Sequence, residues 1–478
     1  MSTPSTLPAS VADGVKPRLG WTLALLALAQ LIYALDLNIV FVALPRIGAD
    51  LGFPGQTQQL VVSAYVVFAG GFLLFGGRAA DLLGRRRVFV LALALYALSS
   101  LAGGLAAGPV VIIVARAVQG VGGALLLPST LALLNSLFAE GRPRNRALAV
   151  WGGAGASGLT IGALLGGVLT ENFGWPAVFF VNVPLAGLVA VAALAVVPRD
   201  PARRERRKFD MPGALTVTGG ATLLVFALVE GPELGWGSPL VAGAFAVAAV
   251  LLVIFALVEA RSADPLMPFR LFRNRSLTVG MLVTFVYMAT FGVLPYFLTV
   301  LLQSVHGYSA LQSGLAFLVP SLAIAAGTQG GERLATRIGT RATLLIGFAV
   351  GVAGTAVLAL GFDADAGYGL LIPGLVVSGL GQGVVWTAMW IAAATGTPAH
   401  EQGVANGIAS TALNIGNAIG LAVFTVIADL GTAGRTGHAL RAATADGEYL
   451  VVLLTAAVMI AGLLVTLTLP RRTPDPTP

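Results

Sequence analysis

The sequence predicts an all-α polytopic membrane protein, and three observations support that prediction. Of the 478 residues, 57% are hydrophobic and only 10% are charged, whereas soluble domains carry about 25% charged residues. The apolar runs are continuous over about 20 residues, the length that crosses a bilayer as a helix. They do not alternate over about 10 residues, as the strands of a membrane β-barrel do.

Fourteen apolar segments are long enough to cross a bilayer as helices. The predicted spans are 20–44, 57–77, 88–106, 109–137, 147–169, 177–197, 212–230, 239–258, 277–301, 312–330, 343–361, 367–393, 403–428 and 449–469. The first segment is too long for the apolar core of a signal peptide, and no small-residue cleavage site follows it. It is therefore counted as the first spanning helix.

The basic residues predict the orientation of these spans. If both termini share one side, nearly all of the 28 Lys and Arg residues fall on that side. The exceptions are Arg46, Arg435 and Arg441 in the opposite loops and Arg116 within a span. Because positive loops stay inside, both termini are predicted to be cytoplasmic. The net charge of +7 is then explained by orientation and by contact with anionic membrane lipids, without nucleic acid.

The chain also repeats itself. Arg78 and Gly84 have counterparts 255 positions later in Arg333 and Gly339, which predicts two parallel six-helix bundles with a site between them. The predicted organisation is a tail at 1–19, a first bundle at 20–200, a basic loop with two inserted helices and the following loop at 201–275, a second bundle at 276–470 and a tail at 471–478.

Asp36 lies inside the first span, where a carboxylate costs about 3 kcal/mol. The usual reason to keep an acid there is to bind or pass a cation or a proton. At a rise of 1.5 Å per residue, Asp36 and Arg116 lie at similar depths of roughly 13 and 10 Å from the same side. We expect the two to communicate directly, or through Gln119 and water. The alternative is a structural ion pair that only joins the first and fourth helices.

The loop after the second span combines glycine, acid and arginine at fixed spacing, in Gly77, Asp81, Gly84, Arg85 and Arg86. Gly84 permits a tight turn that a residue with a Cβ resists. Asp81 can pair with the arginines or face a helix N-terminus. A loop that only orients the chain would need neither the acid nor the glycine. The pattern resembles the cytoplasmic loop signature of the major facilitator superfamily.

The fifth span carries glycines that form a groove for close helix packing, in Gly158, Gly162, Gly166 and Gly167. The pattern resembles the antiporter signature of drug exporters, except that Ala163 stands where a proline is usual. The alternative is that these glycines serve packing alone, without a role in gating.

Further stretches resemble the fourteen-helix drug:proton antiporter branch of that superfamily, and the resemblance covers about 20 to 470. They are 35–45, 182–184, 265–275 and 403–407, while 116–123 resembles a signature of the superfamily as a whole. The resemblance implies a major facilitator fold, with two six-helix bundles plus two inserted central helices, and export of amphipathic compounds in exchange for protons. Asp36 would be the protonation site, Arg116 would modulate it, and Asp81 would lock the cytoplasmic gate around 401–407.

Asp36 is expected to face a cavity between the bundles, and polar and aromatic residues are expected to line it. The candidates are Tyr33, Asn38, Tyr65, Phe285, Tyr287, Tyr296, Trp386 and Trp390. Such walls suit a flat hydrophobic molecule, although the aromatics could equally be packing or interface residues. Because no second carboxylate is expected deep in a span, neutral, zwitterionic, anionic or monocationic lipophiles are favoured over dications.

The energy source is expected to be a proton gradient, with no cofactor. No phosphate-binding loop with a lysine is present, since the only lysines are Lys16 and Lys208. With no cysteine and three scattered histidines, no metal site is expected. The near absence of lysine indicates a GC-rich bacterial genome and hence the bacterial cytoplasmic membrane. The alternatives are an uptake symporter, a non-transporting receptor or scaffold, and an intramembrane enzyme, for which no nucleophile and base pair is apparent.

Overall fold

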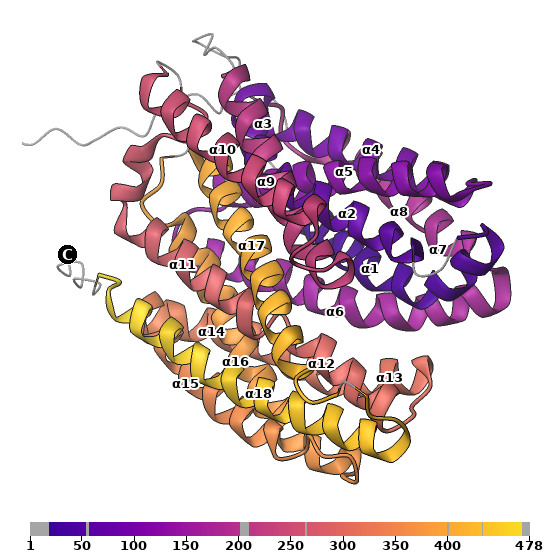
Figure 1. Ribbon diagram of the computed structural model, residues 1–478. Helices are drawn as coiled ribbons and strands as arrows, with labels where there is room; N and C mark the ends of the chain where they lie inside the picture. Colours follow the sequence, from indigo (N-terminus) through magenta and orange to yellow (C-terminus); the bar gives the residue numbers. More distant parts are fainter. Residues whose placement is uncertain are drawn as a thin grey trace, which may run out of the picture.

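The computed structural model describes residues 19–53, 57–200, 210–262, 265–398, 401–432 and 434–470. These residues form helices joined by short connections, and no strand occurs among them (Figure 1). Both predicted tails and most of the basic loop at 201–209 lie outside the described residues, apart from Leu19.

The first half of the described chain forms a helical body in which α1 packs on α6, α2 on α5, and α4 on α5 and α8. Its helices are α1 (Leu19–Asp50), α2 (Leu60–Gly71), α3 (Leu73–Leu83), α4 (Arg85–Gly104), α5 (Pro109–Leu137), α6 (Arg142–Phe173), α7 (Pro176–Phe180) and α8 (Asn182–Val196).

The second half forms a similar body in which α11 packs on α17, α14 on α16, and α15 on α16 and α18. Its helices are α11 (Arg275–Thr290), α12 (Leu294–Val300), α13 (Ala310–Ala316), α14 (Leu318–Ile338), α15 (Thr340–Ala359), α16 (Tyr368–Ala394), α17 (Gln402–Ala428) and α18 (Gly437–Leu467). Figure 1 shows the two bodies as an indigo-to-magenta group and an orange-to-yellow group.

An antiparallel hairpin of α9 (Met211–Leu234) and α10 (Pro239–Arg261) lies between the two halves in sequence. Helix α9 packs on α2 of the first half and on α17 of the second, while α10 packs on α9. Each helix begins with a capped N-terminus: Asp210 accepts a hydrogen bond from the Gly213 amide, and Ser238 accepts one from the Val241 amide. The predicted insert therefore spans the seam between the halves.

Among the described residues, twelve helices are long and apolar enough to cross a membrane, or thirteen if α2 and α3, bent by 51°, are one span. They coincide with thirteen of the predicted spans. The remaining one, 147–169, falls within α6, which is 32 residues long and is not among these candidates. The count of fourteen and the proposed bundle boundaries thus stay predictions.

The two halves meet along two seams. Helix α17 packs on α3 and α5, and α14 packs on α6. One end of the molecule is called the basic end here, because the predicted basic loops at 85–87, 142–146 and 333–341 lie there. At this end α3, α5 and α14 finish, and α4, α6, α15 and α17 begin. Both seams bring the two halves into contact at the basic end.

Candidate functional site

Asp36, on α1, is fully buried and all its hydrogen bonds described here come from the first half of the chain. Its Oδ2 accepts from a terminal guanidinium nitrogen of Arg116 on α5 at 2.6 Å. Its Oδ1 accepts from Gln119 Nε2 and from Asn182 Nδ2, each at 2.9 Å. Because three donors surround the carboxylate, its charged form is well satisfied in this conformation.

Arg116 is equally enclosed, with 1% of its surface exposed. Its Nε donates to the Val61 carbonyl oxygen at 3.1 Å, and its guanidinium also donates to Gln119 Oε1 at 2.8 Å. The guanidinium carbon lies 4.3 Å from the ring centroid of Tyr65, within the range of a cation–π contact. The predicted communication between Asp36 and Arg116 is thus a direct ion pair, reinforced by Gln119.

The expectation that Asp36 faces a cavity between the bundles is wrong for this conformation. The carboxylate lies between α1, α5 and α8 of the first half, and its side chain has no exposed surface. The physical reason is that α5 and α8 of the same half supply the donors described for the carboxylate, so the acid points into its own bundle. Tyr65, predicted to line the cavity, also lies in this interior, with 1% of its surface exposed.

Three tyrosines lie next to the Asp36–Arg116 ion pair and contact one another. The hydroxyls of Tyr65 and Tyr96 lie 3.3 Å apart, and Tyr65 is also hydrogen-bonded to Tyr33. Tyr33 is only partly buried and lies on α1 one turn before Asp36. Tyr33 therefore links the enclosed ion pair, through Tyr65, to a partly buried position on α1.

Asn182 is a member of the site to which sequence reasoning assigned no role. It begins α8, is fully buried, and donates to Asp36 Oδ1. The sequence signal for Asn182 was its place in the 182–184 stretch. In the structure, a fully buried amide at the start of a helix needs a hydrogen-bond acceptor, and Asp36 supplies it.

We expect Asn182→Leu to destabilise the folded chain by roughly 1–3 kcal/mol, because one donor to the buried carboxylate is lost. The melting temperature in detergent measures this loss. Asn172→Leu is the matched control, since Asn172 is exposed and bonds only the carbonyl of Val168 on its own helix α6. An equal loss in both variants would contradict the assignment.

Glycines of α6 bring α1 into place. A Cβ at Gly158 or Gly166 would lie 2.6 Å from the Leu31 carbonyl oxygen or 2.7 Å from that of Ile39, and a Cβ at Gly162 would overlap the carbonyl of Leu35. These contacts flank Asp36 on α1. The prediction of a packing groove holds for these three glycines.

Gly167 is the exception in the predicted groove, because a Cβ there would meet nothing within 4 Å. Gly167 follows Gly166 directly, and adjacent helical residues point in directions about 100° apart. Its predicted packing role is therefore wrong. The side chain of Ala163 lies outside the described residues.

Asp81 joins the two halves at the basic end. Its Oδ1 accepts from the amide of Gly403 at 3.0 Å and its Oδ2 from the amide of Val404 at 2.9 Å, both in the first turn of α17. Arg85 pairs with the same carboxylate at 3.5 Å. A carboxylate on the free amides of a helix N-terminus is a favourable arrangement. The predicted contact near 401–407 is present.

The rest of the loop supports that contact. A Cβ at Gly77 would overlap the Gly403 carbonyl, so the small residue lets α3 and α17 cross at backbone distance. Gly84 has φ +104°, a conformation that glycine adopts readily. Asp200 then accepts from the amides of Arg86 and Arg87 at 3.0 and 3.2 Å and caps α4. Gly77, Asp81 and Arg85 thus lie at the contact with α17, whereas Gly84 and Arg86 lie at the Asp200 cap of α4.

Amide side chains add to the closure at the basic end. Asn135 of α5 donates to Gln402 at 3.2 Å and to Asn406 at 3.4 Å on α17. Asn145 of α6 donates to the Thr336 hydroxyl of α14 at 3.2 Å. In this conformation the two halves are therefore held together along both seams at the basic end.

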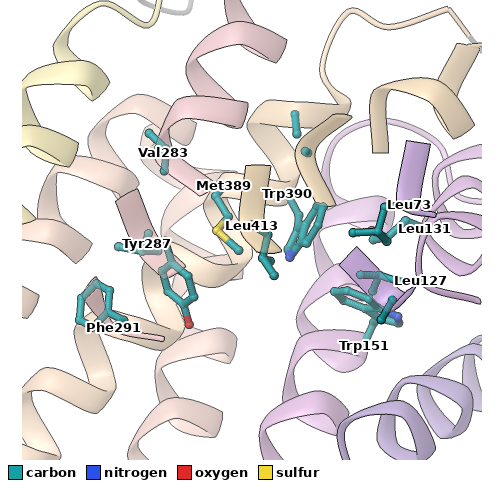
Figure 2. Close-up of a cluster of buried hydrophobic side chains, with 14 of the residues drawn as sticks. Leu73, Leu127, Leu131, Trp151, Val283, Tyr287, Phe291, Met389, Trp390 and Leu413 are labelled. Atoms are coloured by element: carbon teal, nitrogen blue, oxygen red, sulfur yellow. The ribbon is translucent and has the colours of Figure 1, made fainter. Parts of the chain in front are cut away.

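An aromatic cluster also bridges the halves (Figure 2). Trp151 of α6 stacks on Trp386 of α16, with ring centroids 6.0 Å apart, and meets Trp390 edge-on at 5.8 Å. Tyr287 of α11 lies 5.4 Å from Trp386. Tyr287, Trp386 and Trp390 were predicted as a group, whereas Trp151 was missed because only the tertiary packing brings α6 against α16.

The remaining cavity candidates do not join this cluster in the contacts described. Asn38 and Phe285 are partly buried, and the backbone of Phe285 packs against Gly416 of α17. Tyr296, on α12, is 44% exposed and pairs edge-on with Phe297. No role in a shared cavity follows from their positions.

One further buried carboxylate lies in a helix, outside the boundary predicted for the last span. Helix α18 begins at Gly437 rather than at 449, so Glu448 lies within it, 1% exposed. The adjacent Gly447 packs on the Ala428 carbonyl at the end of α17. This acid belongs to the α17–α18 contact in the second half. Glu230 of α9 and Glu259 of α10 are also buried.

Comparison with known proteins places this arrangement among transporters. The family model "Major Facilitator Superfamily" matches residues 26–421 and 280–478. The chain is 36% identical to the "Puromycin resistance protein pur8" of Streptomyces alboniger, over 96% of this chain and 92% of that protein. It is 38% identical to the "Cephamycin export protein CmcT" of Amycolatopsis lactamdurans, over 86% and 85%.

Solved structures agree on the fold. The crystal structure of the human organic anion transporter MFSD10 matches with a TM-score of 0.68 at 18% identity, covering 94% of this chain and all of that chain. At this identity the likeness concerns the fold alone. Transporters of the matched family work by alternating access, which requires two halves that can separate at one end while they close at the other.

Proposed function

Because this chain belongs to the Major Facilitator Superfamily and is a multi-pass membrane transporter rather than an enzyme, we propose that it is a proton-coupled antiporter. It exports small lipophilic drugs or antibiotics across the bacterial cytoplasmic membrane. The proposed halves are 20–200 and 276–470, both termini are cytoplasmic, and the basic end faces the cytoplasm. Protons, cargo and membrane lipids are its expected partners.

The enclosed ion pair of Asp36 and Arg116 is the observation that carries this proposal. Holding a charged pair inside a span is costly, and such groups commonly mark proton or ion pathways. Protonation of Asp36 would remove the charge that holds Arg116 and would release Gln119 and Asn182 from the carboxylate. A single proton can therefore change the contacts among α1, α5 and α8 together.

The transport cycle follows from the closed basic end. With Asp81 bound to α17, the conformation described here is shut toward the proposed cytoplasmic side. Opening that side requires Asp81 and Asn135 to leave α17. We propose that cargo enters there and lodges near the aromatic cluster of Trp151, Trp386 and Trp390. The halves then rock, and the cargo leaves on the other side as a proton reaches Asp36.

The proton gradient is a sufficient energy source. One proton that moves down roughly 100–150 mV releases about 2.3–3.5 kcal/mol. At 1.4 kcal/mol per tenfold, this supports about 50- to 300-fold accumulation of a neutral cargo.

Cargo identity is the finer part of the proposal. The relatives are named for puromycin resistance, cephamycin export and tetracenomycin C resistance and export, so these three compounds form the first test panel. The uncharged aromatic cluster favours flat lipophiles among them, since stacking needs no charge.

The test uses inverted membrane vesicles with an imposed proton gradient, acidic inside, and a pH-sensitive dye. An antiporter dissipates the gradient when a panel compound is added outside, because the compound enters as protons leave. Vesicles without the protein are the control. A symporter would instead move protons and cargo in the same direction, and that outcome would overturn the antiport proposal.

A further inference from the structure

The segment that follows the inserted hairpin is fastened at both of its ends. At one end, Glu259 of α10 accepts from the amides of Leu266 and Met267 at 3.0 and 3.1 Å. At the other, Asn274 accepts from the Ser276 amide at 3.0 Å and donates to the Thr395 carbonyl at 3.0 Å. The described segment 265–274 is therefore a fixed strap between the hairpin and the second half.

Arg270 lies in the middle of this strap, on the 3-10 helix Phe269–Arg273. It forms an ion pair with Glu401, the residue that directly precedes α17. The two partners differ in burial: the Arg270 side chain is 59% exposed and that of Glu401 is 1% exposed. The strap thus supplies the cation for a carboxylate buried at the start of α17.

The same helix start is the one that Asp81 holds. Glu401 precedes by two residues Gly403, whose amide donates to Asp81. Asn135 of α5 reaches Gln402 between them. The N-terminus of α17 is consequently held from the first half through Asp81 and Asn135, and from the strap through Arg270.

Apolar packing fastens the hairpin to these helices only in part. A cavity of about 300 Å³ remains between α9, α10, α3 and α17, lined by residues that include Leu74, Leu252, Phe255 and Thr411. The polar contacts of the strap therefore add to the packing of α9 on α17 in fixing the hairpin.

We propose that the inserted hairpin and its strap form a second latch of the gate. Arg270 and Glu401 are its positioning residues, and they hold the N-terminus of α17 where Asp81 can bind it. The consequence for transport rests on the proposed function, but the latch itself concerns only which end of the molecule is closed.

The unequal burial of the pair gives the latch a distinctive signature. Removing Arg270 takes a cation away from a buried carboxylate, which is the costly case. Removing the charge of Glu401 leaves an arginine that already reaches water, which costs little beyond the pair itself. Arg270→Gln should therefore open the gate more than Glu401→Gln, and the double variant should resemble Glu401→Gln.

The test measures the distance across the basic end. The chain has no cysteine, so Leu83→Cys and Ile338→Cys place two spin labels on exposed sites, 53% and 48% exposed, one in each half. Double electron–electron resonance measures the distances between the two labels. It is applied to the full chain in lipid nanodiscs, without cargo or gradient, and gives the populations of open and closed molecules. We expect Arg270→Gln to raise the ratio of open to closed molecules about threefold or more.

Arg273→Gln is the matched control, because Arg273 is an exposed arginine on the same 3-10 helix. It should leave the distances unchanged, and Arg270→Glu with Glu401→Arg should restore the closed population. Unchanged distances in Arg270→Gln, or an equal change in Arg273→Gln, would overturn the latch. The distance measurement uses no cargo, so its result does not depend on whether any panel compound is transported. A negative distance result would overturn the latch but would leave the antiport proposal to be decided by the vesicle assay.

Discussion

Asp36→Asn should abolish proton-driven accumulation of cargo while leaving the protein able to bind and equilibrate it. Asparagine keeps the shape of the side chain, and its amide oxygen can still accept from Gln119 and Asn182. Its amide nitrogen cannot accept from Arg116 in place of Oδ2, and the side chain cannot carry the proton. The accumulation ratio should fall from about 50- to 300-fold to about one, because the gradient no longer does work. Uptake into inverted vesicles, measured with and without the gradient, gives this ratio.

The control for this variant is Asp50→Asn, which makes the same change at an exposed carboxylate of the same helix. It should accumulate cargo as the unmodified chain does. Exchange of labelled for unlabelled cargo, which needs no net proton movement, shows whether Asp36→Asn is folded. Full gradient-driven accumulation by a folded Asp36→Asn protein would remove the basis of the proposed mechanism.

The second large effect is expected from Gly162→Val. Its side chain would overlap the Leu35 carbonyl and push α1 away from α6, one residue before Asp36. Overpacking of a close contact costs about 1–3 kcal/mol or more. We expect transport to fall at least about tenfold, and the melting temperature in detergent to fall with it.

Gly167→Val tests whether the effect comes from the close contact. It makes the same substitution on the same helix, with the same loss of helix propensity, at a site where a Cβ meets nothing within 4 Å. Transport and melting temperature should stay close to those of the unmodified chain. If both variants lose transport equally, intrinsic helix preference rather than the α1–α6 approach is responsible.

The predicted depths of Asp36 and Arg116 agreed with the structure because helical rise is the same in every helix. Two charges counted from the same membrane face must then lie at one level, and only the bundle decides whether they touch. The ion pair at 2.6 Å answers that second question. The same reasoning could not place Asn182, since its contact with Asp36 depends on how α8 lies against α1.

Errors in the sequence-based predictions arose where the direction of a side chain mattered. The sequence alone does not show which of Gly166 and Gly167 points toward α1, and in the structure only Gly166 contacts it. Glu448 was assigned outside a span because hydropathy declines before 449, but packing of α18 on α17 extends the helix to Gly437. Trp151 was missed because a tryptophan in a glycine-rich span gives no sign of the helix it will face.

What the amino-acid sequence determined alone is the position of thirteen of the predicted spans, the shared level of Asp36 and Arg116, and the acid and glycine pattern of the loop before α4. These follow from segment length, hydropathy and local turn geometry, which neighbouring residues decide among themselves. Only the tertiary structure decided that Asp36 is enclosed within the first half, and that Arg270 reaches Glu401. Both depend on the packing of helices distant in sequence, because burial and partners are properties of the assembled bundle.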